Sequence, residues 1–156
     1  MAEHYLLLKW LHIVGAAILF GTGLGIAFNF WLALRGASVA AIAAAARATV
    51  VADFVFTLPA VVLQPVTGVA LALAAGYPLT ASWIVGSFVL YAIAGACWIP
   101  VVFIQLRMRD LAAKSLAEGT ALPEEFQRLS RRWFVLGWPA FIAVGAIFWL
   151  MIARPP

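Results

Sequence analysis

A single histidine lies inside a long apolar stretch near the N-terminus. The stretch "LLLKWLHIVGAAILFGTGLG", residues 6–25, carries Lys9 near its start and His12 further in. Inside a membrane, a neutral histidine can hydrogen-bond across helices, titrate in a proton path or ligate a metal. Taken alone, one histidine in a membrane span favours the first role, a hydrogen bond between helices. The residues at the same depth must decide among the three roles.

Among metal centres, haem is the one that these residues allow most easily. A site built only from protein needs several Cys, His or carboxylate ligands at one depth, whereas the chain has one cysteine, Cys97, and its other histidine, His4, lies two turns earlier. A porphyrin supplies four ligands, so the protein adds only one or two. The residues therefore allow haem with His12 as an axial ligand, although on the residues alone a structural histidine is favoured. Copper handling is an alternative that has few soft ligands.

One acidic residue, Asp53, interrupts the second apolar stretch. An ionised carboxylate is costly in hydrocarbon, so Asp53 should face a partner inside the protein. Asn29, Gln105 and Arg107 fall at a comparable depth on other stretches, and Arg47 lies just beyond. This polar network either fixes the protein through an ion pair or hydrogen bonds, or it handles protons.

The elements that must position these residues are transmembrane helices. The chain of 156 residues is 66% hydrophobic and 10% charged, with a mean hydropathy of +1.06, whereas soluble domains are about 25% charged. Its four apolar runs are each long enough to cross about 30 Å of hydrocarbon. We predict one all-α domain over residues 1–156, a four-helix bundle with spans at about 5–34, 49–75, 82–106 and 133–153.

The connections between these spans differ in composition. An Ala-rich connector covers residues 35–48, "GYPLT" forms a turn at 76–80, and a charged loop covers 107–132. The loop should be helical on both sides of "EGTALPEE", because proline followed by two glutamates is typical of a first helical turn.

Basic residues predict the orientation of the chain. Eight of the ten Lys and Arg residues fall in the first and third connections, and such residues favour the cytoplasmic side. We therefore expect a multi-pass protein of the bacterial inner membrane with both termini outside. The net charge of +4 then reflects topology and contact with lipid headgroups, and it does not indicate nucleic-acid binding.

Counting along antiparallel spans places a polar pocket around His12. This residue lies about 10 Å below the outer surface, at 1.5 Å per residue. Gln64, Thr67 and Tyr91 reach the same level from the second and third spans. A polar cluster at this level is therefore possible, and with a haem on His12 these residues would line its pocket, with Lys9 near the surface as partner of a propionate.

Small residues recur on one side of the first span. Ala17, Gly21 and Gly25 are four residues apart, and Asn29 continues the row. Such a row lets another helix approach closely. The neighbour is either another span or a second copy of the chain, and we expect self-association.

Two resemblances refine these expectations. The opening "LKWLHIVGAAILFGTG" resembles the first helix of a broad group of small bacterial membrane proteins that includes the HemJ-type protoporphyrinogen oxidases and the CopD-like copper-resistance proteins. Nearly the whole chain, including "TLPAVVLQPVTGVAL" and "PLTASWIVGSFVLYAIAGACWIPVV", resembles an uncharacterised family of predicted integral membrane proteins.

The wider resemblance implies a function. In HemJ-type proteins the histidine of the "LH" pattern is associated with haem b, which implies a porphyrin-handling protein or membrane oxidoreductase with His12 as ligand and a quinone or other redox partner. The chain has no second intramembrane histidine, so the haem would be five-coordinate, hold another sixth ligand or be shared between subunits. The alternative is a cofactor-free scaffold or transport-like protein with a polar network around Asp53.

Overall fold

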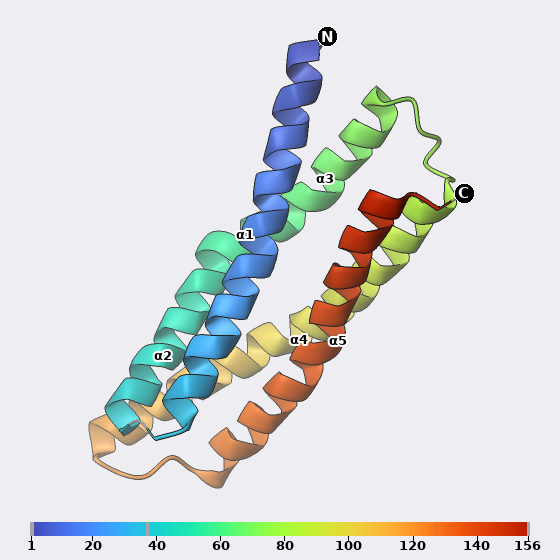
Figure 1. The fold of residues 1–156 in the computed structure, drawn as a ribbon. Coiled ribbons are helices and arrows are strands. Elements are labelled where there is room, and N and C mark those ends of the chain that lie inside the picture. The colour runs from blue at the N-terminus through green and yellow to red at the C-terminus, as the bar shows by residue number, and fades with distance from the viewer. Residues whose placement is uncertain (1, 37, 156) are drawn as a thin grey trace.

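The computed structural model describes residues 2–36 and 38–155, and nearly all of them are helical, with no strand in these two ranges (Figure 1). Helices α2, η1 and α3 follow one another without a break, so the chain forms four long helical segments and the two termini lie at the same end. This confirms the predicted all-α, four-helix architecture. The elements are α1 (Ala2–Leu34), α2 (Val39–Ala52), the π-helix η1 (Asp53–Thr57), α3 (Leu58–Ala74), α4 (Ser82–Glu118) and α5 (Glu124–Ala153).

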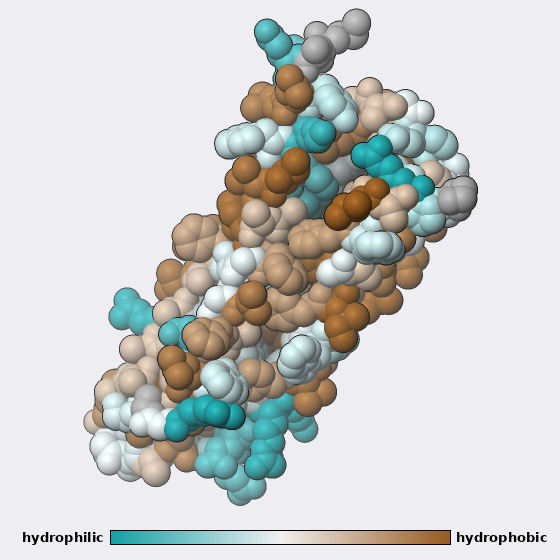
Figure 2. Space-filling view, in the orientation of Figure 1, coloured by the Kyte–Doolittle hydropathy of each residue, from teal (hydrophilic) through white to brown (hydrophobic). Residues whose placement is uncertain are grey.

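The outside of the bundle is apolar along its length. Large side chains such as Val66, Phe103 and Ile142 expose more than 60% of their surface, at 62%, 68% and 67%. Figure 2 shows apolar residues along the middle of the visible face and hydrophilic residues toward both ends. All four segments are long and apolar enough to cross a membrane. A hydrocarbon surrounding explains this surface, because apolar side chains face lipid tails at no cost and helices satisfy most of their backbone hydrogen bonds internally.

A core cluster lies at the end of the bundle where α1 joins α2 and α4 joins α5. Phe30, Met108 and Phe126 are almost fully buried there. The ring of Trp133 packs edge-on against Phe30, with 5.3 Å between centroids. This apolar packing holds α1, α2, α4 and α5 together below the polar sites, and thereby fixes the positions of those sites.

The first connection is much shorter than the sequence predicts. Residues 35–48 were expected to be a connector, but α2 begins at Val39. The hydroxyl of Ser38 accepts a hydrogen bond from the Ala41 N–H at 3.3 Å and caps the helix. The alanines that follow have the highest helix propensity, so the correction follows from composition.

The third connection is also mostly helical. As expected, α4 and α5 continue well past residue 106 and before residue 133, and only residues 119–123 between them are non-helical. Gly119 ends α4 with φ of 65°, a left-handed conformation that glycine adopts without strain.

A proline explains the π-helical turn in the second segment. Pro59 has no N–H to donate to the carbonyl of Val55, and its ring would clash with that carbonyl in a regular α-helix. The backbone instead opens by one residue, so the Leu58 N–H bonds to the Asp53 carbonyl. Figure 1 shows the segment changing direction between α2 and α3 at this point. Such wide turns often occur at functional sites.

Candidate functional site

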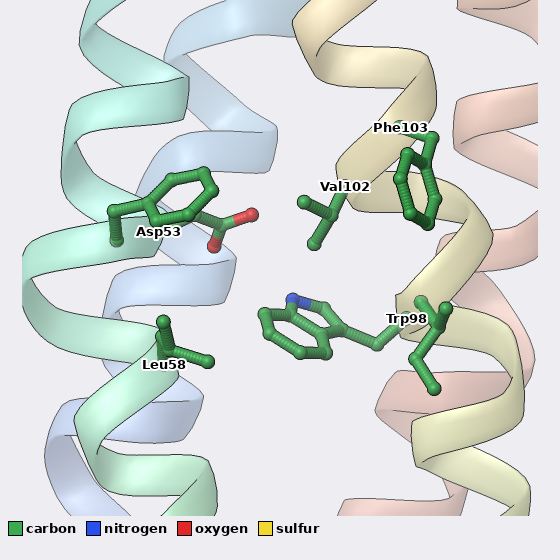
Figure 3. A pocket seen from close by; sticks show the side chains of 7 residues that line it. Asp53, Leu58, Trp98, Val102 and Phe103 are labelled. Atoms are coloured by element: carbon green, nitrogen blue, oxygen red, sulfur yellow. The ribbon is translucent and has the colours of Figure 1, made fainter.

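Asp53 is the first residue of η1 and is only 4% exposed. Its carboxyl group points across the gap toward α4, and the ring of Trp98 points back toward it (Figure 3). Side-chain groups of Thr57, Gln105 and Trp98 surround the carboxyl group. The structure therefore assembles a buried acidic site from η1 and α4.

Several polar atoms in this site lack a partner. In the part of the chain that the structure describes, Oδ2 of Asp53, Oγ1 of Thr57 and Nε1 of Trp98 are buried and form no hydrogen bond. A buried polar group without a partner costs about 1–3 kcal/mol. These atoms lie beside one another, so a small shift of the side chains, or an added proton, water or polar ligand, would satisfy them.

A cavity of about 210 Å³ adjoins the carboxyl group. It has room for several water molecules, each of which takes up about 30 Å³ in the liquid. Apart from Asp53 its lining residues are apolar or aromatic, and the surface that faces the cavity is apolar. The lining residues are Asp53, Phe54, Leu58, Trp98, Ile99, Val102 and Phe103.

The predicted polar network is only partly assembled. Gln105 lies beside Asp53, whereas Arg107 donates two hydrogen bonds to Glu125 at 2.8 and 3.0 Å. Arg47 is exposed, and among residues 2–36 and 38–155 Asp53 has no salt bridge.

Asn29 also lies elsewhere, because it is exposed and lines a second cavity between α1 and α2. Conversely, Thr57 and Trp98 were not predicted for this site. The four-residue spacing from Asp53 was the available signal for Thr57, and no local pattern indicates Trp98.

The predicted grouping around His12 is largely present in the geometry. Nδ1 of His12 lies 2.8 Å from Oγ1 of Thr67, and the Gln64 amide donates to the His12 carbonyl at 2.9 Å. The Thr67 hydroxyl also lies 2.7 Å from the Leu63 carbonyl, which can only accept, so Thr67 donates there. Nδ1–H of His12 must then donate to Thr67, which leaves Nε2 as the acceptor nitrogen.

Two glycines permit this contact between α1 and α3. A Cβ on Gly15 would lie 2.5 Å from Nε2 of Gln64, and a Cβ on Gly68 would lie 3.2 Å from Cε1 of His12. Any larger residue would push the helices apart or break the hydrogen bonds. The two glycines are therefore part of the His12 site.

Tyr91 and Lys9 were also predicted for this pocket. Neither forms a hydrogen bond with His12 in the described chain. The hydroxyl of Tyr91 donates to the carbonyl of Val61, which joins α4 to α3 one turn from Gln64. Lys9 is exposed on α1, and no described residue pairs with it.

The imidazole suits one axial bond to haem iron, because ligand histidines typically hold their other nitrogen by a hydrogen bond. The close contact of α1 with α3 closes the space between these two helices, so a porphyrin cannot lie between them at this level. In the described ranges, no three His, Cys, Asp or Glu residues gather to hold a metal ion.

Comparison with known families decides the classification. The family described as "Predicted integral membrane protein (DUF2269)" matches residues 6–155. The chain belongs to this family. The predicted membership of an uncharacterised family of integral membrane proteins is thus confirmed, and contact with the lipid bilayer follows. Searches of curated proteins and of solved structures found no match.

Proposed function

We propose that this DUF2269 protein is a proton-linked membrane protein of the transport-like class, and that Asp53 binds and releases the proton. The observation that carries the proposal is the open hydrogen-bonding capacity of a buried carboxyl group that has no cation beside it in the described chain. Intramembrane carboxylates that face a bundle interior typically mark ion or proton paths.

The neighbours of Asp53 suit both of its charge states. A carboxylate can accept hydrogen bonds from the indole N–H of Trp98 and from the Gln105 amide, whereas a protonated carboxyl group can donate to the Thr57 hydroxyl. Neither state requires a large rearrangement, because these groups already lie next to the carboxyl group, and Figure 3 shows Trp98 directed toward it. Asp53 is one of the residues that line the adjoining cavity, so a movement of its side chain would bring the carboxyl group to that space.

A pH-jump experiment tests this proposal without knowledge of a substrate. Proteoliposomes on a solid-supported membrane are exposed to a sudden pH change, and the charge displaced by proton binding is recorded. We expect a transient in the wild type that Asp53→Asn abolishes. The matched control is Asp110→Asn, which removes an exposed carboxylate on α4 and should leave the transient unchanged. Equal transients in all three proteins would refute the proposal.

The proposal includes an orientation in the bacterial inner membrane with both termini outside. The termini lie at one end of the bundle (Figure 1). The opposite end carries most of the basic residues, in the connection after α1, in α2, and in the parts of α4 and α5 that flank residues 119–123, as a cytoplasmic surface does.

A second candidate function is haem b binding at His12, with a quinone or other redox partner. The observation that favours it is the anchored Nδ1–H, which leaves Nε2 without a partner in the described chain. Bound haem would supply one-electron chemistry. His12 would hold the iron, Thr67 would orient the imidazole, and Gln64 would fix the backbone that carries it.

An absorption spectrum tests the second candidate. Protein purified in mild detergent from haem-replete cells should show a Soret band that His12→Ala removes and His4→Ala, near the N-terminus, leaves in place. A colourless protein that also fails to take up added hemin would reject haem binding and leave His12 as a bridge between α1 and α3.

A further inference from the structure

The row of small residues on α1 faces outward. Ala17, Gly21, Gly25 and Asn29 are all exposed. A Cβ on Gly21 or Gly25 would have no described neighbour within 4 Å, in contrast to the crowded position of Gly15. Since glycine in a helix interior costs about 1 kcal/mol relative to alanine, packing within one chain does not explain these two glycines.

The same face continues into a groove between α1 and α2. This groove has a volume of about 290 Å³, and Gly25, Asn29 and Thr49 are among its lining residues. Thr49 is only 3% exposed, yet its hydroxyl oxygen has no hydrogen-bond partner in the described chain. Asn29 is exposed, and its side-chain amide can both donate and accept hydrogen bonds. Two polar side chains thus border a groove on the lipid-facing side.

A lipid tail cannot satisfy these groups, because hydrocarbon offers no hydrogen-bond donor or acceptor. A second copy of the chain can, because a two-fold interface brings the same residues from each copy together. Small residues at every fourth position drift around the helix, and such a row is typical of helix pairs that cross at about −40° with close backbones. The small residues of α1, the Asn29 amide and the groove between α1 and α2 can therefore pair with the same surface on a second copy of the chain.

We propose that two copies of this protein dimerise through α1, with the backbones in contact along Ala17, Gly21 and Gly25. The Asn29 amide of each copy enters the groove of the other and meets the Thr49 hydroxyl. This interface lies on the side of α1 opposite to His12, so the proposal does not depend on either candidate function.

Disulfide cross-linking in native membranes tests the interface. In a Cys97→Ala background, Gly21→Cys should form a disulfide-linked dimer under mild oxidation, since crossing small-residue helices bring their Cα atoms within disulfide range, about 4.4–6.8 Å. The control is Ile142→Cys, which lies on α5 and is 67% exposed to lipid, and which should stay monomeric. Failure of Gly21→Cys to cross-link, or equal cross-linking of both variants, would overturn the proposal.

Bulky substitutions give an independent readout. Gly21→Leu should weaken the dimer in lipid by at least about tenfold, as measured by energy transfer between labelled copies, because it blocks close helix approach. Gly145→Leu is the matched control, since Gly145 is also exposed and a Cβ there has no described neighbour within 4 Å. A monomeric wild type, or a dimer that Gly145→Leu disrupts and Gly21→Leu does not, would exclude α1 as the interface.

Discussion

Individual residues set how closely α1 approaches α3. Gly15 and Gly68 leave the space in which the Gln64 amide and the His12 ring lie, and the hydrogen bonds follow from that space. Hydrocarbon provides no competing partner for these groups, so they hold the two helices in one register.

The variant Gly15→Ala should therefore destabilise the protein. Its new methyl group displaces Gln64 and leaves buried polar atoms unpaired, at a cost of about 1–3 kcal/mol. Gly95→Ala is the control, because a Cβ there has no described neighbour within 4 Å. Unfolding in mild detergent would be compared for the two variants. Equal stabilities would show that the contact between α1 and α3 does not depend on Gly15.

Sequence reasoning was informative for residues whose depth can be counted along a helix. His12, Gln64 and Thr67 were placed at one level, and the structure brings them together. Lateral neighbours are different, because depth does not determine which side of a helix faces which partner. For that reason Asn29 and Arg107 were grouped with Asp53, although one is exposed and the other pairs with Glu125.

At the scale of elements, the π-turn presents Asp53 and Thr57 to α4. The missing N–H of Pro59 explains why the turn lies where it does. The width of the turn was not predictable, since a proline can also produce a plain kink. The alanines of α2 were assigned to a connector, although their high helix propensity favours the helix that the structure shows.

The variant Pro59→Ala tests the role of this turn. It restores a donor for the Val55 carbonyl, so the segment should close into a regular α-helix and rotate Asp53 away from Trp98. We expect a smaller pH-jump transient, and slower amide exchange at residues 53–58. Pro65→Ala, inside α3, changes a proline away from the π-turn and should affect neither measurement. If both variants behaved alike, the π-turn would not be what positions Asp53 in the acidic site.

At the scale of the whole molecule, the bundle has two polar sites along its length, one around His12 and one around Asp53. The number and class of helices were predictable because apolar length determines them. Which helices pack against each other was not predictable, because side chains that face lipid and side chains in the core are both apolar. The exposed apolar belt in Figure 2 and the compact core around Phe30 use the same residue types.

Reporter fusions test the orientation. Alkaline phosphatase joined after Pro156 should be active, because it folds outside the cytoplasm, whereas a fusion within residues 119–123 should be inactive. The physical reason is the concentration of Lys and Arg within residues 35–48 and within residues 107–132, at the end of the bundle opposite the termini. The reverse pattern of activities would place the termini in the cytoplasm.

The most direct test of the central claim is an infrared difference spectrum of the reconstituted protein between two pH values. Asp53 is the one buried acid among the six in the chain, so its protonated carboxyl band should stand apart from the others. The account predicts a band that is absent in Asp53→Asn, retained in Asp110→Asn and shifted in Trp98→Phe, which removes the indole donor. Spectra that are identical for the wild type and Asp53→Asn would contradict it.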